Sequence, residues 1–135
     1  MQDLVGIIRT KSELERALVQ LDALKARAAR TAVAGGRIYN PSWHLALDLK
    51  TMLLISEAVT RSALMREESR GGHTREDFPK PDPGWGKKNV VTRGRGGKLE
   101  LSTEAVPEIP EELKALLGED KPTGVAAVPV EVGKS

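Results

Sequence analysis

The sequence predicts a mainly helical protein with an extended arm and a small β-hairpin. Two stretches, 13–31 and 41–69, carry apolar residues at the spacings of three and four that indicate amphipathic helices. The chain then loses this periodicity in a segment rich in glycine and proline, and two alternating stretches follow on either side of the glycine-rich sequence 94–97. We therefore expect a helical part at 1–72 and an arm at 73–118.

The first of these helices has a start signal and a clear apolar face. Ser12 with Glu15 three positions later matches the capping box, in which the two residues bond each other's backbone N–H groups. The apolar positions that follow are Leu14, Ala17, Leu18, Leu21, Leu24 and Ala28. This pattern predicts a helix over 13–31, ended by the break at Gly35 and Gly36.

The second helix has a start signal of a different kind. Asn40 can cap it, with Pro41 at the first helical position, where a missing N–H group costs nothing. The helix is expected to run to about Ser69, and Gly71 and Gly72 to end it as a left-handed cap. Its apolar stripe consists of Leu45, Leu49, Met52, Val59 and Ala63, with Ala46, Leu53 and Ala58 beside it. A face this broad can pack against two neighbours.

The segment 1–8 is the candidate for the second neighbour. It has apolar residues at positions 1, 4, 5, 7 and 8, but no residue pattern that would start a helix precedes them. This combination favours the last turns of a helix. We therefore expect three helices, with the first truncated and the chain beginning inside a domain.

The arm is expected to contain two local structures. The stretches 89–93 and 98–102 alternate apolar and polar residues around the turn, which predicts a hairpin over about 89–102. A short helix is predicted over 110–117, and 119–135 lacks any period and is expected to be a disordered tail. An isolated hairpin is marginally stable, so we expect it to dock onto other protein.

Composition excludes several classes of function. The 135 residues include no cysteine, which rules out disulfides, thiolate metal sites and a cysteine nucleophile. The net charge of +2 combines a basic middle with an acidic end. The longest apolar run in the second helix is Met52–Ile55, far short of a membrane span, and no basic stretch follows Met1 as a secretory signal would require. We therefore expect a cytoplasmic location, with any membrane attachment through a partner.

Two other patterns suggest chemistry, and an ordinary structural explanation is stronger for both. His44 and Asp48 lie four apart on one helix face and could bond each other or hold a metal, but no third ligand has suitable spacing. The sequence Gly94-Arg95-Gly96-Gly97 resembles a phosphate loop, yet position 99 is leucine and a strand follows, so a turn is favoured. RNA binding by the basic residues around this turn stays a weaker hypothesis; these are Lys87, Lys88, Arg93 and Arg95.

A cluster of polar side chains surrounds the expected end of the second helix. Its members are Glu67, Glu68, Ser69, Arg70, His73, Arg75, Glu76 and Asp77. One interpretation is a salt-bridged, solvated helix end. The other is that Arg70 and Arg75 make bidentate bonds that hold the arm on a partner surface, with His73 in a polar pocket. Catalysis is less favoured because no nucleophile or cofactor loop accompanies the cluster.

The pattern NPxWHxALDLxxML followed by ESRGGHxREDFP resembles the C-terminal helical domain of succinate dehydrogenase and fumarate reductase flavoprotein subunits, and the related domain of L-aspartate oxidases. The opening MQDLVGIIRT resembles the end of that domain's first helix. The likeness covers about 1–118. The tryptophan and histidine at the start of the second helix favour the dehydrogenase branch. Gly72 departs slightly from the pattern, since alanine is frequent there.

This resemblance implies an up-and-down three-helix bundle attached to a larger flavin domain. It also implies that the parent enzyme uses FAD, assembles with an iron–sulfur subunit and serves electron transport and the tricarboxylic acid cycle. The flavin and dicarboxylate motifs of the family are not in this sequence, so no catalytic, cofactor or metal residue is expected here. The matching positions are assigned to structure and to subunit or domain contact; they are Glu68, Ser69, Arg70, Gly71, His73, Arg75, Glu76 and Asp77. The alternative is a free-standing helical protein-interaction module of the same ancestry.

Overall fold

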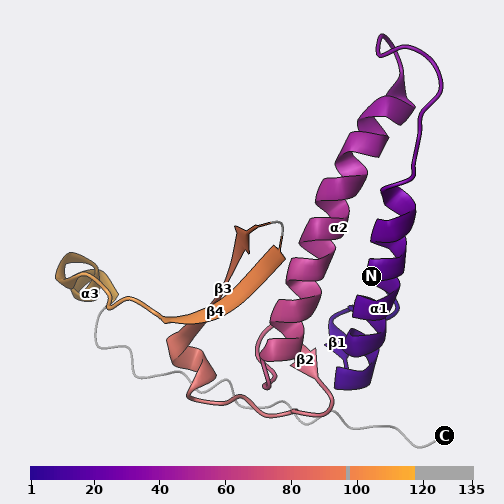
Figure 1. Ribbon diagram of the computed structural model, residues 1–135. Helices are drawn as coiled ribbons and strands as arrows, with labels where there is room; N and C mark the ends of the chain where they lie inside the picture. Colours follow the sequence, from indigo (N-terminus) through magenta and orange to yellow (C-terminus); the bar gives the residue numbers. More distant parts are fainter. Residues whose placement is uncertain (97, 118–135) are drawn as a thin grey trace, which may run out of the picture.

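The computed structural model describes residues 1–96 and 98–117 and confirms the mainly helical fold class. The described residues form α1 (Lys11–Ala28), α2 (Pro41–Met65) and α3 (Glu111–Leu117). Figure 1 shows α1 and α2 packed side by side in opposite directions, with the hairpin against the other side of α2 and α3 away from both. None of these helices combines the length and hydropathy that a membrane span requires.

The prediction of helical turns at 1–8 is wrong. The backbone makes one turn, in which the carbonyl of Met1 accepts the N–H groups of Leu4 and Val5, and then extends into β1 (Ile8–Arg9). This strand pairs in parallel with β2 (Thr74–Arg75), so the segment takes its hydrogen bonds from the arm rather than from its own backbone. Of the apolar residues on which the prediction rested, Val5 is buried, whereas Met1, Ile7 and Ile8 are exposed.

The helix α1 begins two residues before the sequence predicted, with Thr10 and not Ser12 as its N-cap. Thr10 has the extended backbone of a cap, its hydroxyl accepts the N–H of Glu13 at 3.3 Å, and the Glu13 carboxylate accepts the N–H of Thr10 at 2.8 Å. Both T-x-x-E and S-x-x-E satisfy the capping pattern. Thr10 is the N-cap because the preceding residue, Arg9, is extended in β1, so the helix can start directly after it.

Replacing Thr10 with alanine is expected to lower the free energy of unfolding by about 1 kcal/mol, because the N–H of Glu13 loses its acceptor. Ser12→Ala is the matched control, since its hydroxyl meets only the exposed hydroxyl of Thr10. Urea unfolding of both variants measures the difference. An equal loss in the two would show that Ser12 shares the capping role.

The start of α2 is as predicted, but its end is earlier. Asn40 accepts the N–H of Trp43 at 3.3 Å, and Pro41 takes the first helical position. The helix ends at Met65 instead of Ser69, because Arg66 is already extended. Gly71 does have a left-handed backbone, with φ of 57°, but it serves the tight turn that pairs Arg70 with His73 and caps no helix.

Burial is sparse for a chain of this length. The core between the two long helices and the first segment consists of Val5, Leu14, Ala17 and Ala63, with Leu4 and Leu64 packed against it. Further along, Leu21 and Leu53 are buried, and Lys25 bonds the Glu57 carboxylate across the helices at 2.5 Å. Many large apolar side chains remain exposed, among them Leu45, Leu47, Met52, Leu54, Ile55 and Val59 of α2.

The arm contains the predicted hairpin, lengthened at both ends. After the short helix η1 (Trp85–Lys87), β3 (Lys88–Arg95) pairs antiparallel with β4 (Lys98–Ala105), with Val91 opposite Ser102. Gly96 takes the positive φ of 57° that the turn needs. The helix α3 starts one residue later than predicted, and the tail predicted at 119–135 lies outside the described residues.

Candidate functional site at the end of α2

The residues predicted for subunit contact gather where α2 meets the connector, residues 66–84, which leads from α2 to η1. All of them lie in the connector, including Glu68 and Ser69, which were expected to form the last turn of the helix. The side chains of Glu68 and Arg75 are fully buried, those of Ser69 and His73 are partly buried, and Glu76 is exposed.

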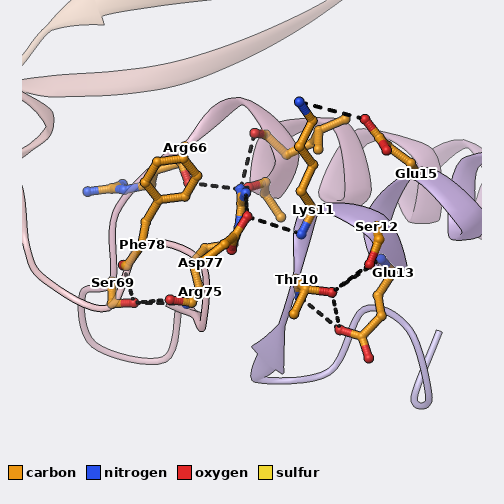
Figure 2. Close-up of polar contacts among 12 residues, drawn as sticks. Thr10, Lys11, Ser12, Glu13, Glu15, Arg66, Ser69, Arg75, Asp77 and Phe78 are labelled. Atoms are coloured by element: carbon orange, nitrogen blue, oxygen red, sulfur yellow. Dashed lines mark hydrogen bonds and ion pairs between the residues drawn. The ribbon is translucent and has the colours of Figure 1, made fainter.

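Arg75 holds the connector against the end of α2. Its Nη1 donates to the carbonyl oxygens of Ala63 at 2.9 Å and Leu64 at 3.2 Å, groups that the helix leaves without an internal partner. Its Nε and Nη2 bond both Asp77 oxygens at 2.8 and 2.6 Å, and this pairing lowers the pKa of Asp77. Asp77 in turn accepts the backbone N–H of Lys11, so one buried guanidinium links the ends of both long helices (Figure 2).

Glu68 is the second buried centre of charge. Its carboxylate accepts Nε of Arg70 at 3.0 Å and Nε of Arg66 at 2.8 Å. It also accepts the backbone N–H of Asp82 at 2.8 Å, which fixes the far end of the connector. The bonds from Arg70, from the Asp82 amide and from Arg66 outweigh burial and lower the pKa of Glu68 to about 2.

His73 connects β1 to the end of α2. Its Nε2 lies 3.0 Å from the carbonyl oxygen of Arg66, which can only accept, so this nitrogen carries the proton. Its Nδ1 accepts Nη2 of Arg9 at 3.0 Å. Burial, with the charges of Arg9, Arg66 and Arg75, outweighs the bond to the Arg66 carbonyl and lowers the pKa of His73, so the ring is neutral near pH 7.

The remaining predicted residues support the turn of the connector. The Ser69 hydroxyl accepts the backbone N–H of Arg75 at 2.8 Å and lies 2.8 Å from the carbonyl oxygen of Phe78 (Figure 2). The backbone N–H of Glu76 donates to the carbonyl oxygen of Arg9. Its side chain is exposed and forms no hydrogen bond with the described residues. Together these contacts make a polar clamp, which we define as Glu68, Ser69, His73, Arg75 and Asp77.

The sequence did not indicate three residues that bond to the clamp: Arg9, Arg66 and Asp82. Arg9 is separated from His73 by 64 positions, so no local pattern joins them. Arg66 falls within the stretch predicted as continuous helix, and Asp82 acts mainly through its backbone. The available signal was the concentration of arginines and carboxylates in residues 66–84, which indicates ion pairing without showing which residues pair.

The other candidate sites remain simple structural features. His44 and Asp48 are exposed, no hydrogen bond joins them, and the His44 ring stands edge-on to Trp43 at 5.1 Å. Within the described residues, no group of three or more side chains is placed to hold a metal. In the hairpin, the side chain of Arg93 forms an ion pair with Glu104 of the adjacent strand β4.

The clamp makes stability dependent on pH on the acid side. Both His73 and Glu68 have folded-state pKa values below their ordinary values of 6.5 and 4.5, so each binds protons more readily when the chain is unfolded. The stabilisation is fully present above pH 6.5. It is expected to fall first as His73 begins to protonate, and again between about 4.5 and about 2 as Glu68 does.

Urea unfolding at about pH 7.5, 5.5 and 3.5 separates the loss due to His73 from the loss due to the carboxylates, in which Asp77 and Glu57, whose pKa values are also lowered, accompany Glu68. The His73→Gln variant is the control, since it removes the upper loss and leaves the lower. An upper loss of the same size in this variant would contradict the assignment to His73.

The chain resembles known proteins along most of its length. A sequence model of the family described as fumarate reductase flavoprotein C-term matches residues 1–115. The chain belongs to this family. The resemblance inferred from the sequence is therefore confirmed, and individual relatives show how far the similarity extends.

A fumarate reductase (CoM/CoB) protein of Methanothermobacter marburgensis is 39% identical over 89 residues, which are 66% of this chain and 16% of that protein. An uncharacterized FAD-dependent oxidoreductase of Methanocaldococcus jannaschii is 37% identical over 95 residues, 70% of this chain and 17% of that protein. The solved structure of the Mycobacterium smegmatis Sdh1 complex in the apo form matches with a TM-score of 0.73 and 44% identity, over 96% of this chain and 24% of that chain. The chain therefore spans between 16% and 24% of these relatives.

Proposed function

We propose that this chain is the C-terminal structural and subunit-contact domain of an FAD-dependent succinate dehydrogenase or fumarate reductase flavoprotein, with no catalysis of its own. Family membership supports the assignment, and the relatives carry most of their length outside the matched region. A relative named as FAD-dependent supports FAD in the parent protein. The flavin domain and an iron–sulfur subunit are the partners that this proposal requires.

One observation carries the proposal: α1 and the first segment cover Leu53 and Ala63 of α2, but a second apolar stripe of this helix stays exposed among the described residues. Leu45, Met52 and Ile55 are 65%, 61% and 57% exposed and recur at spacings of seven and three, which places them on one stripe of the helix. A contiguous exposed apolar surface marks a contact with other protein. The flavin domain is the proposed cover.

The clamp serves this role by fixing the arm. Its buried members, Glu68 and Arg75, hold the connector in one conformation at the end of α2. Arg70, whose side chain is 43% exposed, and Glu76 then face outward and are available to a partner. The residues assigned to contact thus divide into those that position the surface and those that form it.

Recovery of partners from the source cell's extract tests the proposal. The tagged 135-residue chain is expected to recover a protein with a flavin absorbance spectrum, together with an iron–sulfur protein. Ile55→Glu is expected to abolish recovery without changing the stability of the free chain, because Ile55 is exposed. Lys50→Glu, a change at an exposed polar position of the same helix, is the matched control. Equal recovery by the Ile55 variant, or recovery of no flavoprotein, would contradict the proposal.

One observation favours the second candidate, a free-standing helical interaction module. The first segment packs into the chain's own core through Val5 and pairs with the connector through β1, so it is integrated with the rest of the fold. This candidate requires cooperative thermal unfolding and slow hydrogen exchange at the backbone N–H of Thr74, which bonds the carbonyl of Ile7. Broad, non-cooperative melting would exclude it.

A further inference from the structure

An open groove of about 610 Å³ lies where α2, β1 and the hairpin meet. One wall is largely apolar and contains Ala58 and Val59 of α2 and Val90 of β3. The other end is polar and basic, and contains Arg9, Arg66 and His73. The groove is therefore suited to a group with an apolar stem and a negatively charged end.

Arg9 is the unusual residue of this groove. It is only 8% exposed, and arginine is rarely buried to this extent without a charged partner. Of its five N–H donors, one bonds the neutral ring of His73, and its Nε is buried without an acceptor among the described residues. No carboxylate of the described residues pairs with it.

The two carboxylates of the clamp are already engaged. Glu68 bonds Arg66 and Arg70, and Asp77 bonds both arms of the Arg75 guanidinium. Arg9 therefore lies near the cation Arg75 and shares its groove with Arg66, and it has no counter-ion of its own in the described part of the chain. Burial, and then the charge of Arg75, lower the pKa of Arg9, in agreement with an environment that lacks an anion.

We propose that this groove receives the carboxylate of a glutamate or aspartate side chain from an adjoining polypeptide, which accepts N–H groups of Arg9. A planar guanidinium matches a carboxylate in two parallel hydrogen bonds, and the pairing supplies the missing counter-ion. The apolar wall of Val59 and Val90 accommodates the stem of the side chain. That another polypeptide supplies the carboxylate rests on the proposed function. It is supported by the relatives, most of whose length lies outside the region that matches this chain.

A titration of the ¹⁵N-labelled 135-residue chain tests the site directly, with acetyl-glutamate N-methylamide as the probe. The Nε–H resonance of Arg9 is expected to shift and saturate, while that of the exposed Arg16 follows ionic strength alone. Acetyl-glutamine N-methylamide, which lacks the charge, is expected to leave Arg9 unchanged. No saturable shift at Arg9, an equal response to the glutamine probe, or saturation by inorganic phosphate at lower concentration than by the glutamate probe would overturn the proposal.

Arg9→Met provides an independent check. The variant removes a buried cation that has no counter-ion and keeps an apolar stem, but it also loses the bond to Nδ1 of His73, so the free chain is expected to unfold at a nearly unchanged urea concentration. The backbone amides of Ser62 and Val90, which line the groove, are expected to lose their response to the glutamate probe. An unchanged response in this variant would overturn the role of Arg9.

These outcomes are separable from those of the proposed function. A saturable Arg9 response without recovery of a flavoprotein would overturn the proposed function and leave the carboxylate site intact. A flat Arg9 response with recovery of a flavoprotein would overturn the carboxylate site alone.

Discussion

Replacing Arg75 with methionine is expected to lower the free energy of unfolding of the chain by about 3–5 kcal/mol, the range found when one partner of a buried ion pair is removed. The side chain is fully buried, so nothing in solvent can take its place. Its loss leaves the carbonyl oxygens of Ala63 and Leu64 without a donor and removes both bonds to Asp77. Urea unfolding followed by circular dichroism measures the change.

Two further variants identify the cause of this loss. Arg75→Lys keeps the charge but cannot make two parallel bonds to Asp77 while reaching the helix end, so an intermediate loss is expected. Arg16→Met changes an exposed arginine of α1 and is expected to have little effect. A loss in Arg75→Met no larger than in Arg16→Met would show that the end of α2 is stabilised by other contacts.

The helices were predictable from the sequence because their signals are local. The apolar spacing in α1 and α2 and the Asn40-Pro41 start each depend on residues within a few positions of one another. The errors occurred where a distant segment decided the outcome. Pairing of β1 with β2 made the first segment extended, and the same pairing selected Thr10 over Ser12 as the cap.

The candidate site was only partly predictable for the same reason. Arg75 and Asp77 are close neighbours in the sequence, which makes their pairing easy to anticipate, and the structure pairs them. No local pattern could show that Arg75 reaches back to Ala63, nor that Arg9 bonds His73 across 64 positions. The early end of α2 agrees with these contacts, since Arg66 and Ser69 bond other residues of the connector instead of continuing the helix.

Replacing Glu68 with alanine is expected to be the other strongly destabilising change, by about 3 kcal/mol, because a buried carboxylate that pairs with two arginines is removed. Arg66 and Arg70 are partly exposed and regain water, which keeps the loss at the lower end of the range for buried pairs. The backbone N–H of Asp82 loses its acceptor, so its hydrogen exchange should quicken more than that of Thr74 in β2.

Glu68→Gln separates charge from volume in this effect. It fills the same space but presents N–H groups to donors, so it is expected to recover only a small part of the stability lost in Glu68→Ala. Glu67→Ala, at the adjacent exposed glutamate, is the matched control and is expected to be nearly neutral. The difference between the original chain and Glu68→Gln should shrink as the pH falls from about 4.5 to about 2, where the carboxylate becomes protonated. A difference that stays constant over this range would show that the charge of Glu68 is not what holds the connector.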